Sequence, residues 1–80
     1  MAVRILFLGH LRDLAGVSSR DVEGPLDWAG LLNVVGPEVA AQLGEERVSV
    51  ACAGKVLGEK TDLSAYDGDE VALLPPVSGG

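Results

Sequence analysis

Short apolar runs alternate with polar stretches and with glycine and proline breaks, and this pattern predicts short elements of secondary structure. The first run, Ala2 to Leu8, is apolar except for Arg4, is rich in Val, Ile, Leu and Phe, and is followed by Gly9. Its length and composition favour a strand over a helix. Segment 10–16 has two leucines three positions apart and ends in glycine, which is typical of a short helical turn or a tight loop.

The middle of the chain predicts an edge strand and two helical segments. Residues 17–25 are polar and moderately β-prone and end in Gly-Pro, which indicates a second strand at the edge of a sheet. Asp27 is expected to cap the main helix, over residues 28–35, in which apolar residues recur at helical spacing. After a Gly-Pro break, Pro37 begins a second short helical segment that ends at Gly44.

The last part of the chain predicts strands again. Segment 47–54 alternates and then becomes apolar, as a strand would, and residues 55–57 resemble the returning arm of a hairpin. Segment 61–70 has the composition of a turn, in which Asp67-Gly68 tolerates a positive φ. Residues 70–76 predict the last strand.

This order of elements predicts an α+β fold of the β-grasp (ubiquitin-like) type, in which a mixed sheet wraps one main helix and the first and last strands are parallel neighbours. The main alternative is a ferredoxin-like fold, which needs a second full helix where only segment 61–70 is available. The sequence predicts one domain over residues 1–74 and an extended C-terminal Gly-Gly tail over residues 75–80.

Alternation within the first and last strands predicts an apolar patch on the outer face of the sheet. The charged residues Arg4 and Glu70 mark the outward sides of the two strands. If the strands are neighbours, the apolar residues on those sides form a patch beside the root of the tail: Leu6, Leu8, Ala72 and Leu74. Contiguous exposed apolar surface usually marks a docking site. The alternative is a face covered by the domain's own loops.

Composition narrows the classes of partner. Twelve acidic residues against six basic ones give a net charge of −6, which repels a nucleic-acid backbone and favours a protein partner with a basic surface. No apolar run approaches the roughly 20 residues of a membrane span, and no signal peptide is recognisable. We therefore expect no nucleic acid, no membrane and a cytoplasmic location.

Side chains offer little for catalysis. Cys52 is the only cysteine and lies in an apolar run, which predicts a small buried hydrophobic residue. His10 has no second histidine or cysteine with which to share a metal, and the acidic stretch 67–70 lacks the ligand spacing of a calcium loop, so no metal site is predicted. Because nucleophile and phosphate-loop motifs are also missing, a free-standing enzyme is not expected.

The composition of the predicted tail, residues 75–80, restricts its conformation at the start and its width at the end. Pro75-Pro76 removes two backbone donors and stiffens the exit from the sheet. Six residues can span at most about 20 Å, and Gly79 and Gly80 have no Cβ, so they fit a narrow channel. The alternative is a flexible end without a role.

Two segments resemble a known family. "DGDEVALLPPVSGG" (67–80) closely resembles the C-terminal signature of the molybdopterin synthase small subunit, a ubiquitin-like sulfur carrier of the MoaD/ThiS family, and "ILFLGHLRDLAG" (5–16) resembles its opening strand and turn. The resemblance implies that a ubiquitin-activating-like enzyme adenylates the Gly80 carboxylate with ATP and that a sulfur donor enzyme converts the adenylate to a thiocarboxylate. No permanently bound cofactor is implied.

The resemblance also implies a partner. The loaded tail would enter the large subunit of molybdopterin synthase, in a heterotetramer of two small and two large subunits, and donate sulfur to cyclic pyranopterin monophosphate. Gly80 would be the sulfur-bearing residue, and the subunit would have no activity alone. Residues implied to thread the channel are Gly79, Ser78 and Val77. Residues placed at the docking surface are Leu8 and Leu74, with Arg12 either a partner contact or a solvent-exposed side chain.

Three other functions fit the same sequence. The first is a sulfur carrier for thiamine, cysteine or tRNA thiolation, although "PPV" before the tail favours the molybdopterin pathway. The second is a β-grasp interaction module with an idle tail. The third is a protein modifier attached through Gly80 to lysines of its targets.

Overall fold

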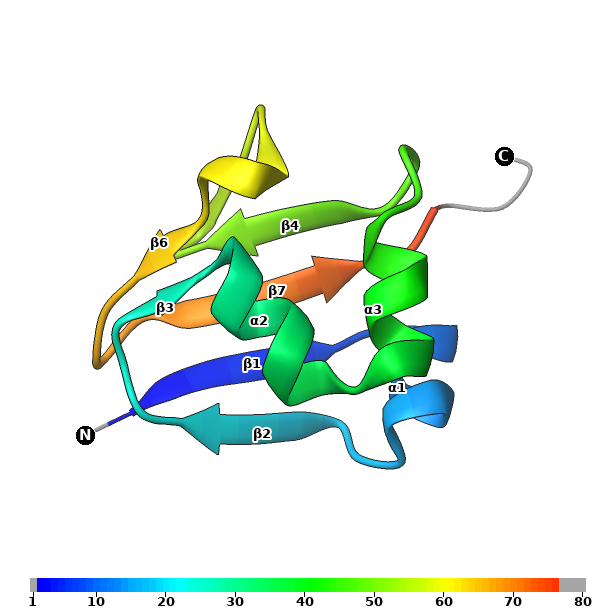
Figure 1. Cartoon of the computed structure of the whole chain (residues 1–80), viewed down its shortest axis with the longest axis horizontal. Coiled ribbons are helices and arrows are strands. Elements are labelled where there is room, and N and C mark those ends of the chain that lie inside the picture. The colour runs from blue at the N-terminus through cyan, green and yellow to red at the C-terminus, as the bar shows by residue number, and fades with distance from the viewer. Residues whose placement is uncertain (1, 77–80) are drawn as a thin grey trace.

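The structure, a computed structural model, describes residues 2–76 (Figure 1). The predicted tail residues Val77, Ser78, Gly79 and Gly80 lie outside the described part of the chain. The elements are β1 (Val3–Phe7), α1 (His10–Ala15), β2 (Ser19–Val22), β3 (Leu26–Asp27), α2 (Trp28–Val35), α3 (Pro37–Leu43), β4 (Ser49–Cys52), β5 (Lys55–Val56), the 3-10 turn η1 (Lys60–Asp62), β6 (Ser64–Ala65) and β7 (Glu70–Leu74).

Five strands form one mixed sheet in the order β2-β1-β7-β4-β5, and β3 and β6 form a separate two-stranded ribbon. The first and last strands, β1 and β7, are parallel neighbours, and every other pair is antiparallel. Helices α2 and α3 lie across one face of the sheet (Figure 1). This is the predicted α+β, β-grasp arrangement. The ferredoxin-like alternative is excluded, because η1 and β6 occupy the segment in which it needs a second helix.

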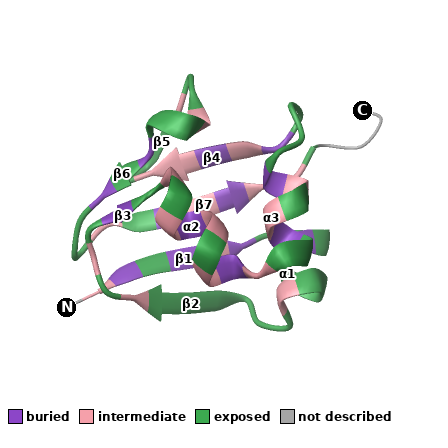
Figure 2. Cartoon of the chain, in the orientation of Figure 1, coloured by how far each residue is buried: buried purple, intermediate pink, exposed green. Residues whose placement is uncertain are grey.

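The core lies between the sheet and the two helices. Figure 2 shows buried residues on β1, β4 and β7 behind α2 and α3. Alternate positions of the central strands point into this core, while their neighbours point to the opposite face. The buried set includes Val3, Ile5, Phe7, Val71 and Leu73 from β1 and β7, and Leu31, Val35, Val39 and Leu43 from the helices. The predicted faces of the first and last strands are therefore confirmed.

Local signals set the helix boundaries as predicted. Asp27 has an extended backbone, and its Oδ1 accepts a hydrogen bond from the Gly30 N–H at 2.8 Å, so it caps α2. Gly36, with φ of 87°, ends α2 and precedes Pro37, the first residue of α3. Helix α1 is also a true helix, and its C-cap Gly16 has the left-handed φ of 79°. Within residues 2–76, no helix is both long and apolar enough to cross a membrane.

Segment 61–70, for which the sequence predicts a turn, contains additional structure. Ser64–Ala65 pairs with Leu26–Asp27 as the β6–β3 ribbon, and Lys60 of η1 donates from Nζ to the carbonyl oxygens of Glu45 and, at 2.9 Å, Val48. A strand of two residues is too short to show alternation of buried and exposed positions, so the sequence pattern does not predict β3 and β6.

The Asp67-Gly68 turn is confirmed. Gly68 has φ of 96°, and the Asp69 N–H donates to the Tyr66 carbonyl at 2.9 Å. The two aspartates bond to backbone: Asp67 Oδ1 accepts from the Gly24 N–H at 2.7 Å, and Asp69 Oδ2 accepts from the Tyr66 N–H at 2.9 Å. Among the described residues, no group of three or more His, Cys, Asp or Glu is placed to hold a metal ion.

Candidate docking surface and tail exit

The face of the sheet opposite the helices has an apolar row that crosses four strands. The strand register places Leu6 beside Ala72, Ala72 beside Ala51, and Ala51 beside Val56. Paired residues in neighbouring strands share a face, so all four side chains point away from the core. Leu6, Ala72 and Ala51 are half-buried, and Val56 is 63% exposed.

The four residues of the predicted apolar patch, Leu6, Leu8, Ala72 and Leu74, are brought together. Leu6 and Ala72 are direct neighbours across β1 and β7, and Leu74 is the next outward residue of β7. Leu8 follows the last residue of β1 and is 39% exposed. The patch therefore lies at the end of the sheet where β7 leads into Pro75. Its docking role remains a prediction.

Sequence reasoning missed two members of this surface. Ala51 and Val56 extend the apolar row beyond the patch toward the edge strand β5. Neither residue belongs to the first or last strand: Ala51 joins the row through the pairing of β4 with β7, and Val56 through the pairing of β4 with β5. The alternation of buried Val50 with its neighbours was the available signal.

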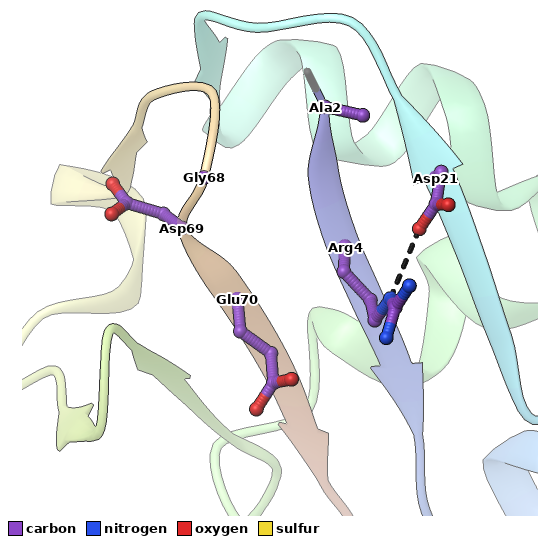
Figure 3. Close-up of a pocket in the computed structure, with 6 residues that line it drawn as sticks. All are labelled: Ala2, Arg4, Asp21, Gly68, Asp69 and Glu70. Atoms are coloured by element: carbon purple, nitrogen blue, oxygen red, sulfur yellow. Dashed lines mark hydrogen bonds and ion pairs between the residues drawn. The ribbon is translucent and has the colours of Figure 1, made fainter.

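The opposite end of the same face is charged. Arg4 is the neighbour of Asp21 on β2 and of Glu70 on β7, and Arg4 Nε lies 3.2 Å from Asp21 Oδ1 (Figure 3). Together with Ala2, Gly68 and Asp69, these residues line a shallow depression of about 300 Å³. Both side chains of the ion pair are more than half exposed, so the pair contributes little to stability. The open face is thus apolar at the tail end and charged at the other.

Two further candidates from the sequence lie on α1. Arg12 is exposed, and its suggested contact with a partner remains a prediction. His10, the first residue of the helix, is also exposed, as expected for a surface residue. Leu14, on the same helix, is 38% exposed and provides a reference outside the patch.

The prediction that Cys52 is buried is wrong. Cys52 is the last residue of β4 and is only half-buried, because the sheet ends beside it at the turn formed by Ala53 and Gly54. Burial, followed by the nearby Asp69 carboxylate, raises the pKa of its thiol above the ordinary value. Both effects disfavour the thiolate, which is the nucleophilic form.

We expect Cys52 to react slowly with iodoacetamide at neutral pH, with a rate that rises only above the pH range in which free cysteine deprotonates. Replacing Asp69 with Asn removes one cause of the raised pKa and should move the profile to lower pH. Asp62→Asn, at an exposed position of η1, is the control and should not shift it. A wild-type profile matching free cysteine would contradict the assigned environment. The measurement is alkylation rate against pH by mass spectrometry.

Comparison with known proteins finds a matching family and similar proteins. The model of the ThiS family matches residues 5–80. A molybdopterin synthase sulfur carrier subunit from Chlamydomonas reinhardtii is 32% identical over 84 aligned positions, and both chains are covered in full. The crystal structure of small archaeal modifier protein 1 from Haloferax volcanii is 26% identical, has a TM-score of 0.69 and covers 100% of each chain.

A third similarity concerns the fold alone. The complex of subunits 1 and 2 of molybdopterin-converting factor from Helicobacter pylori includes a chain that is 21% identical, with a TM-score of 0.65 and coverage of 100% of each chain.

Proposed function

Because the chain belongs to the ThiS family, we propose that it is the sulfur-carrier subunit of a molybdopterin synthase, with Gly80 as the residue that bears the sulfur. The observation that supports this most directly is the full-length similarity to the sulfur carrier subunit of Chlamydomonas reinhardtii. The apolar patch at the root of the tail supports it independently, because a carrier needs a docking surface next to its reactive end.

The proposed chemistry takes place at the main chain. A carboxylate is a poor electrophile, so an adenylating enzyme of the ubiquitin-activating type joins the Gly80 carboxylate to AMP from ATP and releases pyrophosphate. A sulfide equivalent from a sulfur donor enzyme then displaces AMP and leaves a thiocarboxylate. This sulfur is a stronger nucleophile than the oxygen it replaces. The cofactors are thus a transient acyl-adenylate and a thiocarboxylate, and ATP use fits a cytoplasmic location.

The proposed partner is the large subunit of molybdopterin synthase. It contacts the apolar patch, accepts the tail in a narrow channel, and supplies the catalytic side chains that this chain lacks. With a net charge of −6, the carrier favours a partner whose docking surface is basic. The sulfur acceptor is cyclic pyranopterin monophosphate, which receives two sulfur atoms to form the dithiolene of molybdopterin.

The proposal is tested by intact mass measurement. The protein is incubated with ATP, an adenylating enzyme and a sulfur source, and a second sample lacks ATP. We expect a mass gain equal to replacement of one oxygen by sulfur, located at Gly80, in the complete reaction only. An unmodified carboxylate under conditions that load a known carrier would contradict the proposal. Adding the large subunit and cyclic pyranopterin monophosphate then distinguishes the molybdopterin pathway from thiamine, cysteine or tRNA thiolation.

A protein modifier is the second candidate, favoured by the full-length similarity to small archaeal modifier protein 1. A modifier would transfer its C-terminal acyl group to lysine amines of other proteins. The discriminating product is therefore an isopeptide-linked conjugate that survives thiol treatment. Conjugates in cells without any thiocarboxylate form of the free protein would favour the modifier.

A further inference from the structure

The turn that follows β1 has a backbone conformation reserved for glycine. Gly9 has φ of 58° and ψ of −137°, and the Leu11 N–H donates to the Leu8 carbonyl across it at 3.2 Å. Positive φ at the first central position is the mark of a type II′ turn, in which glycine is strongly preferred. The Gly9 carbonyl then accepts from the Arg12 N–H at 3.1 Å and opens α1.

Pro75 lies directly against this glycine. A Cβ added at Gly9 would be 2.8 Å from Pro75 Cγ, closer than real Cβ atoms approach, and within 4 Å of two further atoms of the ring. The strand register leads to this contact. Phe7 and Leu73 are partners in the parallel β1–β7 pair, and Gly9 and Pro75 follow each of them by two residues.

This contact limits how the chain leaves the sheet. The pyrrolidine ring is closed onto the backbone nitrogen and holds φ near −65°, so the ring cannot turn aside as a flexible side chain could. A Cβ at position 9 would therefore require either the turn or Pro75 to shift. Pro75 is half-buried, whereas Pro76 is exposed, so the contact with the domain is made at the first residue after β7.

We propose that Gly9 is a positioning residue for sulfur transfer: its lack of a side chain lets Pro75 pack on the turn after β1 and sets the angle at which the tail leaves β7. The inference rests on the proposed function. Leu8 and Leu74 immediately precede the two contacting residues, so the contact lies at the edge of the apolar patch. A partner docked on the patch therefore lies beside the point at which the chain leaves the domain.

The test compares Gly9→Ala with Gly16→Ala. Gly16 also has positive φ, 79°, but a Cβ there meets nothing within 4 Å. Both variants place a side chain at a positive φ, with more backbone strain at Gly9, whose ψ is −137°, than at Gly16, whose ψ is 0°, and only the first disturbs Pro75. For carriers loaded enzymatically, we expect Gly9→Ala to lower the single-turnover transfer rate at saturating large subunit by about tenfold or more, since small misplacements of reacting groups cost up to about 100-fold. The Kd for the large subunit should stay within about twofold for both variants.

A double-mutant cycle separates the contact from general strain. In a Pro75→Ala background, which removes the ring, Gly9→Ala should cause no further loss of rate. If Gly9→Ala does not fold, Pro75→Ala alone tests the same contact and should lower the transfer rate with Kd unchanged. Equal transfer rates for Gly9→Ala and Gly16→Ala, or full additivity in the cycle, would overturn the inference.

A measurement without any loading keeps this inference distinct from the proposed function. In the free wild-type protein, nuclear Overhauser effects between the Gly9 Hα and Pro75 Hγ protons are expected. Residual dipolar couplings of the amides after residue 76 should change in Gly9→Ala and not in Gly16→Ala. A missing Gly9–Pro75 effect overturns the inference even if the protein loads sulfur. A wild type that shows the contact but never loads sulfur instead contradicts the proposed function.

Discussion

Removing Gly80, or adding one residue after it, is expected to abolish sulfur transfer while the thermal unfolding midpoint stays at the wild-type value. The reacting group in the proposed chemistry is the carboxylate of Gly80, and neither change leaves that carboxylate on the same residue at the same distance from the domain. Among residues 2–76, every buried core residue lies between Val3 and Leu73, and neither change alters any of them. Intact mass after loading and calorimetric unfolding measure the two effects.

The control for this prediction is a change elsewhere in the chain of similar size. Gly58→Ala adds one methyl group at an exposed position where a Cβ meets nothing within 4 Å, and it should load and transfer like the wild type. The contrary result is an extended variant that still restores molybdenum cofactor synthesis in cells lacking their own carrier. That outcome would remove Gly80 from the mechanism.

Introducing a carboxylate into the apolar patch is expected to weaken binding of the large subunit by about 10- to 100-fold. Leu74→Asp and Leu8→Asp each place a charge where the docked partner would exclude water, and an unpaired desolvated charge is unfavourable. Leu14→Asp is the matched control, because Leu14 on α1 and Leu8 are 38% and 39% exposed, respectively. Titration calorimetry with the large subunit gives the three Kd values.

Equal weakening by Leu8→Asp and Leu14→Asp would mean that negative charge alone, rather than the patch, lowers affinity. Unchanged binding by Leu74→Asp would remove that residue from the interface. Because Leu8 and Leu14 have nearly the same exposure in the free protein, a difference between their variants reflects burial of the new charge by the partner rather than by the carrier's own fold.

Elements with a repeating pattern or a local boundary signal were predictable from the sequence. The two-residue period of β1 and β7 assigned their buried and outward faces, and the cap at Asp27 and the Gly36-Pro37 break located both longer helices. These signals are local, and the structure keeps them because packing and propensity agree at these positions.

The features that escaped prediction depend on contacts between distant segments. The β3–β6 ribbon is two residues long on each side, too short for any period. Cys52 lies in an apolar run, which is typical of a core position. It is, however, the last residue of β4, where neighbouring residues bury it only in part. The contact of Gly9 with Pro75 joins residues 66 positions apart in the numbering (75 − 9) and follows only from the register of β1 against β7. For the candidate site, therefore, strand parity predicted the patch but not the tail exit.

The parallel pairing of β1 with β7 has a practical consequence for handling the protein. Two parallel neighbours begin at the same end of the sheet, so Ala2 lies beside the charged depression and β7 leaves the sheet at the opposite end, as the directions of β1 and β7 in Figure 1 show. Affinity tags, fluorophores or surface linkers attached ahead of Ala2 therefore start at the end of the sheet opposite the apolar patch. Attachment at that end leaves the docking surface free for immobilised binding assays.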